Sequence, residues 1–127
     1  MQNPFTAPTP EAVLAALSAL RAPRVRSEYD LHALVAAALS AAALPCLHEA
    51  ALFPGRRIDF LCGTVGVEVK RGRPPARTVI SQLTAYAKSP RIQTLVLVAE
   101  KLPRLPETVG GKPLLTVSLS VLWGVAL

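Results

Sequence analysis

Two acids lie within a short stretch of strand-forming sequence and have the type and spacing to bind a cation together. Residues 57–70 read RIDFLCGTVGVEVK, in which Gly63 and Thr64 suit the two-residue turn of a β-hairpin. With this turn, residues whose numbers add to 127 face one another, so Asp59 lies opposite Glu68. Like charges about 5 Å apart at Cβ repel one another and weaken a sheet. A divalent metal ion would reverse the sign of this interaction.

Lys70 belongs to the same side of its strand as Glu68, because side chains two residues apart point the same way. It can therefore reach a water molecule held by the metal. Carboxylate oxygens suit Mg²⁺, with Mn²⁺ as its substitute, better than zinc, and magnesium sites often use only one or two protein carboxylates. The competing interpretation is that Asp59, Glu68 and Lys70 form a solvated polar face.

Alternation along the hairpin predicts one apolar face and one polar face. The face predicted to enter the core contains Ile58, Phe60, Cys62, Val65, Val67 and Val69. The opposite face contains Arg57, Asp59, Leu61, Gly66, Glu68 and Lys70.

Asp59 followed on the next strand by Glu68-Val69-Lys70 resembles the signature of the PD-(D/E)xK nuclease superfamily, which has the restriction-endonuclease-like fold. Ile58 stands where the signature is often written with proline. The resemblance implies that Asp59, Glu68 and the backbone carbonyl of Val69 bind the metal. It also implies that Lys70 positions or activates the attacking water.

Two further residues match positions that many members of this superfamily occupy. A glutamate on the helix before the first strand corresponds to Glu28, and a glutamine on the helix after the signature corresponds to Gln82. Gln82 with Tyr86, ahead of the apolar run 94–98, is similar to small phage and prokaryotic members. The resemblance covers about residues 27–100.

Position alone leaves other roles open for these side chains. Glu28 lies one turn before Leu31 on an apolar helix stripe, so we expect it to approach the core, but it could simply complement the helix dipole. Gln82 could be an exposed helix residue. Tyr86 could stack on a base or plug its helix against the sheet.

Three further polar residues are not assigned to the predicted site. Glu49, on the strand before the hairpin, is either a third acid at the site or an exposed edge-strand charge. His48 alternates to the other face from Glu49, and His32 is isolated on its helix. Neither histidine has metal-ligand spacing, so neither is included in the site.

Positive charge is concentrated around the acids. Residues 56–91 hold eight basic and two acidic side chains, which accounts for the whole net charge of +6. Such a field suits a polyanion, because lysine and arginine displace phosphate counterions, although basic residues could merely keep an apolar protein soluble. The side chains predicted to contact nucleic acid are Arg57, Arg71, Arg73, Arg77, Tyr86 and Lys88.

The 127 residues, with 51% hydrophobic and 17% charged residues, predict one globular domain of the α/β class. We divide it into an N-terminal arm and helix, residues 1–26, and a nuclease-like domain, residues 27–127. The predicted core is a central mixed β-sheet flanked by helices in the order α-β-β-β-α-β. Its predicted elements are helices near 10–20, from 27 and at 77–88, and strands at 46–53, in the hairpin 57–70 and at 92–99; residues 100–113 are predicted to form a loop, and 114–127 a last strand and short helix.

The chain is expected to act in the cytoplasm and not in a membrane. Its longest apolar run, 31–44, is too short to span a bilayer, and no secretory signal is recognisable at residue 1. Cys46 and Cys62 lack metal or redox spacing, so we predict two small buried thiols without a disulfide.

The resemblance implies a Mg²⁺-dependent phosphodiesterase, an endo- or exonuclease acting on DNA junctions, flaps or ends. The alternatives are a nuclease acting on RNA, and a nucleic-acid-binding or assembly module that keeps the fold without turnover. Trp123 in the apolar C-terminal stretch suggests a homodimer, and similarity to phage members suggests a larger phage or host complex.

Overall fold

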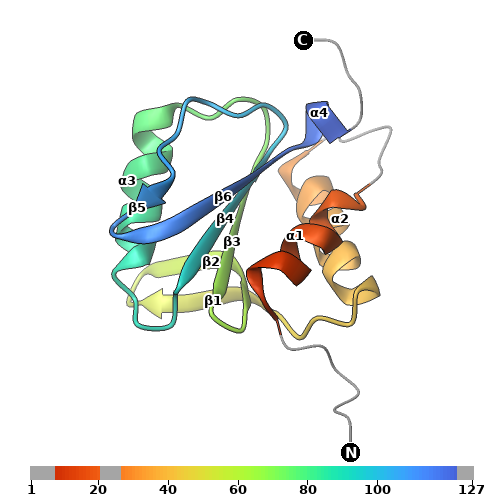
Figure 1. Cartoon of the computed structure of the whole chain (residues 1–127), viewed down its shortest axis with the longest axis horizontal. Helices are drawn as coiled ribbons and strands as arrows, with labels where there is room; N and C mark the ends of the chain where they lie inside the picture. The colour runs from red at the N-terminus through yellow and green to blue at the C-terminus, as the bar shows by residue number, and fades with distance from the viewer. Residues whose placement is uncertain (1–7, 21–26, 123–127) are drawn as a thin grey trace, which may run out of the picture.

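Helices cover both faces of one mixed β-sheet in the computed structural model, which describes residues 8–20 and 27–122 (Figure 1). The sheet has six strands in the order β1-β2-β3-β4-β6-β5. Helices α1 and α2 lie on one side of it and α3 lies on the other (Figure 1). The elements are α1 (Pro10–Ser18), α2 (Glu28–Ala41), β1 (Leu47–Phe53), β2 (Arg56–Cys62), β3 (Val65–Lys70), α3 (Ala76–Ala87), β4 (Thr94–Ala99), β5 (Thr108–Val109), β6 (Lys112–Ser118) and α4 (Leu119–Leu122).

The predicted order of a helix, three strands, a helix and a strand is confirmed between α2 and β4. β2 pairs antiparallel with both β1 and β3, whereas β4 pairs parallel with both β3 and β6. Because α3 connects the parallel strands β3 and β4, it must cross one face of the sheet. The chain is therefore a single small α/β domain with a mixed sheet.

Local sequence signals set the helix starts as predicted. The Thr9 hydroxyl accepts from the Ala12 N–H at 3.1 Å, and Pro10 occupies the first turn of α1. The Ser27 hydroxyl accepts from the Asp30 N–H at 3.1 Å and caps α2. Each cap satisfies a backbone donor that has no partner inside its helix.

The hairpin register is confirmed, but the predicted alternation along β2 is wrong at Ile58. Phe60 pairs with Val67 and packs beneath α2, whereas Ile58 packs with the residues beneath α3. The shift coincides with an irregularity on the adjacent strand: Glu49, between the pairs His48↔Phe60 and Ala50↔Ile58, has φ 51°, a left-handed conformation uncommon outside glycine. The side-chain alternation therefore shifts beside Asp59.

The face predicted to be polar is instead a second core. Leu61 and Gly66 are buried there together with side chains of α3 and β4. A Cβ on Gly66 would lie 2.6 Å from Ile58 Cδ1 and 2.7 Å from Ile92 Cδ1, so only glycine fits without movement of these side chains. Both sheet faces are thus closed by helices, and the acids must lie where the strands separate.

The N-terminal helix shares the core of the remaining chain. Val13 and Leu17 of α1 are fully buried in the same cluster as Leu31 and Val35 of α2. The expected N-terminal arm lies largely outside the described residues.

The region 100–113, predicted to be a loop, contains the two-residue strand β5, which pairs with β6 through the turn at Gly110 and Gly111. The predicted last strand and short helix correspond to β6 and α4. Trp123, on which the homodimer prediction rests, lies outside the described residues.

Among the described helices, none has the length and apolar character required to cross a membrane.

Cys46 and Cys62 form a disulfide, contrary to the prediction of two free thiols. The bond joins the residue before β1 to the last residue of β2. Antiparallel pairing of these strands brings the two cysteines together, and their spacing in the sequence does not indicate the bond. The crosslink ties together the two strands that carry His48 and Asp59.

Candidate active site

Asp59 and Glu68 replace the backbone ladder where β2 and β3 separate. Backbone pairing between these strands runs from Cys62↔Val65 to Phe60↔Val67. At the next position, the Val69 N–H donates to Asp59 Oδ2 at 2.8 Å and the Asp59 N–H donates to Glu68 Oε1 at 3.4 Å. The predicted juxtaposition of the two acids is thus present. Each carboxylate is oriented by a backbone donor from the opposite strand.

Lys70 pairs with the more deeply buried acid. Its Nζ lies 3.1 Å from Glu68 Oε2, and the Lys70 side chain is 27% exposed whereas that of Glu68 is only 4% exposed. The ammonium group therefore connects the buried acid to solvent. This position lets Lys70 reach a water molecule or a substrate oxygen next to the acids.

The groups around Asp59 and Glu68 do not fully offset the cost of burying two negative charges. Burial, and then the charge of Asp59, raise the pKa of Glu68 to about 7. Burial also raises the pKa of Asp59, although the hydrogen bond from the Val69 N–H opposes this effect. Adding positive charge at this position would favour both ionised forms.

The donor set fits a hard divalent cation. Asp59 and Glu68 provide carboxylate oxygens, which Mg²⁺ and Mn²⁺ prefer, and their unfavourable proximity is what a cation relieves. Within residues 8–20 and 27–122, no three His, Cys, Asp or Glu side chains are grouped closely enough to hold a metal. A magnesium site built on two carboxylates does not require such a group.

His32 of α2 joins the site, although the sequence interpretation left it out. Its Nε2 lies 3.6 Å from Asp59 Oδ2, which is too far for a hydrogen bond. This nitrogen is buried and has no hydrogen-bond partner among the described residues. Glu28 lies four residues earlier on the same helix, so their spacing on one helix face was the signal available in the sequence.

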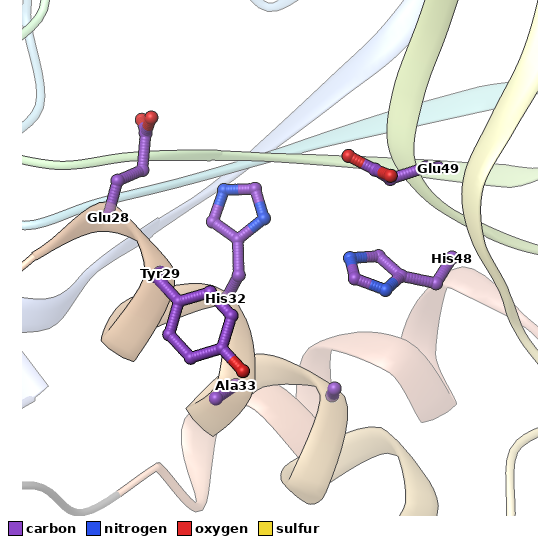
Figure 2. A pocket seen from close by; sticks show the side chains of 7 residues that line it. Glu28, Tyr29, His32, Ala33, His48 and Glu49 are labelled. Carbon is purple, nitrogen blue, oxygen red and sulfur yellow. The ribbon is translucent and has the colours of Figure 1, made fainter.

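Glu28 does not approach the core as predicted. It is exposed at the start of α2, on the rim of a cavity of about 390 Å³ that also receives His32, His48 and Glu49 (Figure 2). The stripe that predicted its burial consists of Leu31, Val35 and Leu39, and the first turn of α2 leaves Glu28 outside it.

Glu49 and His48 share that cavity because the alternation breaks between them. In Figure 2 the Glu49 carboxylate and the His48 ring both extend from β1 towards His32 on α2. The His48 ring stacks on Phe60 with centroids 4.7 Å apart. Glu49 is exposed, and the contacts described for Asp59 and Glu68 do not include it.

Gln82 and Tyr86 of α3 form a hydrogen-bonded chain that ends on the backbone of β2. Gln82 Nε2 donates to the Tyr86 hydroxyl at 3.0 Å, and that hydroxyl donates to the Arg57 carbonyl at 2.9 Å. The Gln82 amide is thus directed to Tyr86 and not to Asp59 or Glu68. Tyr86 is only 3% exposed, so the prediction that it contacts nucleic acid is wrong, and the plugging role is the correct one.

Replacing Tyr86 by phenylalanine should lower stability without changing affinity for a nucleic acid. The change removes a buried hydroxyl and leaves the Arg57 carbonyl and the Gln82 amide without that partner. We expect the free energy of unfolding to fall by about 1–2 kcal/mol in urea denaturation. Tyr29→Phe is the matched control, since Tyr29 is 82% exposed. Unchanged stability together with weakened binding would contradict this role.

The predicted nucleic-acid contacts do not form one set. Arg71, Arg73 and Arg77 lie in the loop after β3 and the first turn of α3, and all are exposed. Glu100 fixes this loop by accepting from the Gly72 N–H at 2.8 Å and pairing with Arg71 at 3.6 Å. Arg71 and Arg73 are therefore held on an ordered loop next to the end of β3, and Arg77 follows at the start of α3.

The remaining two basic contacts lie on other elements. Lys88 follows the other end of α3, a helix of 12 residues and hence about 18 Å long. Arg57 is exposed on β2, where its backbone carbonyl accepts from Tyr86. In the hairpin register Arg57 faces the end of β3, so only Lys88 is clearly remote from Arg71 and Arg73.

Comparison with known proteins returned no match: no family model, curated protein or solved structure is recognisably similar to the chain. The class that fold and site define is therefore a small α/β domain with a paired-carboxylate site. The superfamily resemblance rests on the residues alone.

Proposed function

We propose that this chain is a metal-dependent phosphodiesterase that hydrolyses DNA. One observation carries the proposal: two adjacent, largely buried carboxylates and a lysine meet where β2 and β3 separate. A merely structural site would gain little from this arrangement, since removing like charges from a buried position favours folding. Unfavourable charge held in place is a common property of functional sites.

The metal ligands in this proposal are Asp59, Glu68 and the Val69 carbonyl, with Mg²⁺ as the resident ion and Mn²⁺ as its substitute. When bound, the ion supplies Lewis-acid polarisation of the scissile phosphate. Lys70 hydrogen-bonds the attacking water and orients it, because its ammonium group extends from Glu68 towards solvent. Gln82 acts indirectly by fixing Tyr86, and Glu28 lies too far out on the cavity rim to have an assigned step.

Nucleic acid is the substrate class that the charge supports. Arg71 and Arg73 offer positive charge on a loop that Glu100 holds in place beside the end of β3, and Arg77 adds to it from the start of α3. Such side chains bind the phosphate backbone without reading sequence. The order of elements from α2 to β4 also supports a restriction-endonuclease-like arrangement, which we include in the proposal.

A cleavage assay tests the proposal directly. Purified protein is incubated with labelled single-stranded, duplex, flap and four-way-junction DNA, and with RNA, in Mg²⁺, Mn²⁺ or chelator. We expect cleavage of DNA that requires the metal and disappears in Asp59→Asn, which keeps the side-chain size and controls for contaminating nucleases. Binding without cleavage under all conditions would instead support a binding or assembly module.

A further inference from the structure

A cavity opens next to the carboxylate pair, between α2 and β1. Its volume is about 390 Å³, near the lower end of the roughly 300–1,000 Å³ range of ligand pockets. Glu28, Tyr29, His32 and Ala33 line it from α2, and His48 and Glu49 line it from β1 (Figure 2). Its size suits a single flat ring system.

The charge of this cavity is opposite to that of the basic loop. Glu28 and Glu49 are its charged side chains, and no lysine or arginine of the described residues lines it. A phosphate group would be repelled there. A neutral heterocycle would not, and carboxylates and imidazoles can accept or donate hydrogen bonds at the edge of a base.

An exposed aromatic ring stands on the same cavity. The Tyr29 side chain is 82% exposed, so its ring is open to a ligand in the cavity. Nucleic-acid-binding proteins use such rings as platforms on which bases stack. The ring is available for this role because Tyr29 belongs to the first turn of α2 and packs into neither core cluster.

His32 joins the cavity to the carboxylates. Its ring lines the cavity, and its buried Nε2 lies 3.6 Å from Asp59 Oδ2 without a hydrogen-bond partner among the described residues. A ligand that reaches from the cavity to Asp59 must therefore pass this imidazole. A nucleotide has the required form, with a flat base at one end and a phosphate at the other.

We propose that the cavity binds an unpaired nucleobase of the substrate, stacked on Tyr29, while the adjoining phosphate lies at Asp59 and Glu68. The inference rests on the proposed function and narrows its substrate to single-stranded DNA or frayed ends. A base inside a continuous duplex must first be unstacked and unpaired at a cost in free energy, whereas a single-stranded base is already accessible.

Binding without hydrolysis tests the cavity separately from catalysis. Three ligands of equal length and charge per strand are compared in chelator: oligothymidylate, a fully abasic strand, and a duplex. They are compared again in Mg²⁺ with Lys70→Ala. We expect oligothymidylate to bind roughly 5- to 150-fold more tightly than the abasic strand, the range that one stacked base provides.

Tyr29→Ala should remove this preference, and Tyr29→Phe should keep it, because the ring and not the hydroxyl provides the stacking surface. Neither change should affect folding, since Tyr29 is exposed. Equal affinity for the abasic strand and oligothymidylate, an unaltered preference in Tyr29→Ala, or no binding of any strand would each overturn the inference.

The same variants separate this inference from the proposed function. If the wild type cleaves duplex and single strands equally and Tyr29→Ala leaves both rates unchanged, the nuclease proposal stands and the cavity inference fails. If no DNA is cleaved in any metal while the Tyr29-dependent base preference persists, the cavity inference stands and the nuclease proposal fails.

Discussion

Replacing Lys70 by alanine should lower the rate of DNA cleavage by roughly 10²- to 10⁴-fold, the usual contribution of a positioned proton-transfer or orienting group. Lys70 Nζ lies 3.1 Å from Glu68 Oε2 and is the cation that extends from the buried acid towards solvent. Without it, the attacking water loses its orienting donor. The measurement is the single-turnover rate constant of cleavage in Mg²⁺ with enzyme in excess, beside an equilibrium binding assay with the same DNA.

Arg73→Ala is the matched control for Lys70→Ala. It removes the same charge from an exposed position three residues further along, away from the carboxylates. We expect it to weaken DNA binding and lessen its salt dependence while the single-turnover rate constant at saturating protein stays within about threefold, because a phosphate contact acts on binding. If both variants lost the same fraction of activity, Lys70 would contribute general charge only, and its assignment to the attacking water would be wrong.

The hairpin is the part of the molecule that sequence reasoning predicted best. A two-residue turn fixes the register of its strands, so the pair Phe60↔Val67 and the contact between Asp59 and Glu68 followed directly. Helix starts were equally accessible, because Ser27 and Thr9 act through residues only three positions away. Such features depend on local chemistry.

The features that were missed depend on contacts between distant segments. A strict period of two assigned Ile58 to the wrong core, because nothing in the composition of β1 signals the positive φ at Glu49. His32 lies far from Asp59 in the sequence, and only the packing of α2 against the sheet brings them together. The Cys46–Cys62 disulfide is another product of strand pairing.

Tyr86 shows a different limit. A lone aromatic residue in a basic region has the same sequence signal whether it stacks on bases or closes a core. Its hydroxyl reaches the Arg57 carbonyl only because α3 crosses the face of the sheet that alternation had assigned to solvent. Tyr29, which is exposed beside the site, carried no sequence signal that distinguished it from Tyr86.

Replacing Glu68 by glutamine should abolish cleavage and at the same time stabilise the metal-free protein above pH 7. Glu68 is buried, and its pKa is raised from 4.5 to about 7, first by burial and then by Asp59. The folded state therefore binds more protons than the unfolded state between these two values, so stability falls as pH rises through this window. Glutamine removes the ionisation.

The expected size follows from the same shift. In chelator, the free energy of unfolding of the wild type should fall by up to about 3 kcal/mol between pH 4.5 and pH 8 through this group, and that part of the fall should be absent in Glu68→Gln. Urea denaturation across this range measures it. Glu107→Gln, at an exposed position, is the control and should keep the pH dependence of the wild type.

Metal addition completes the test, because a bound cation must favour the ionised form of the acid that holds it. At pH 8, millimolar Mg²⁺ should raise the free energy of unfolding of the wild type and of Glu107→Gln, and should leave Glu68→Gln unchanged, since only a ligand that binds the folded state stabilises it. A Glu68→Gln protein that is less stable than the wild type at pH 8 would mean that Lys70 already compensates the carboxylate fully. In that case the charge imbalance that supports a metal site would not exist.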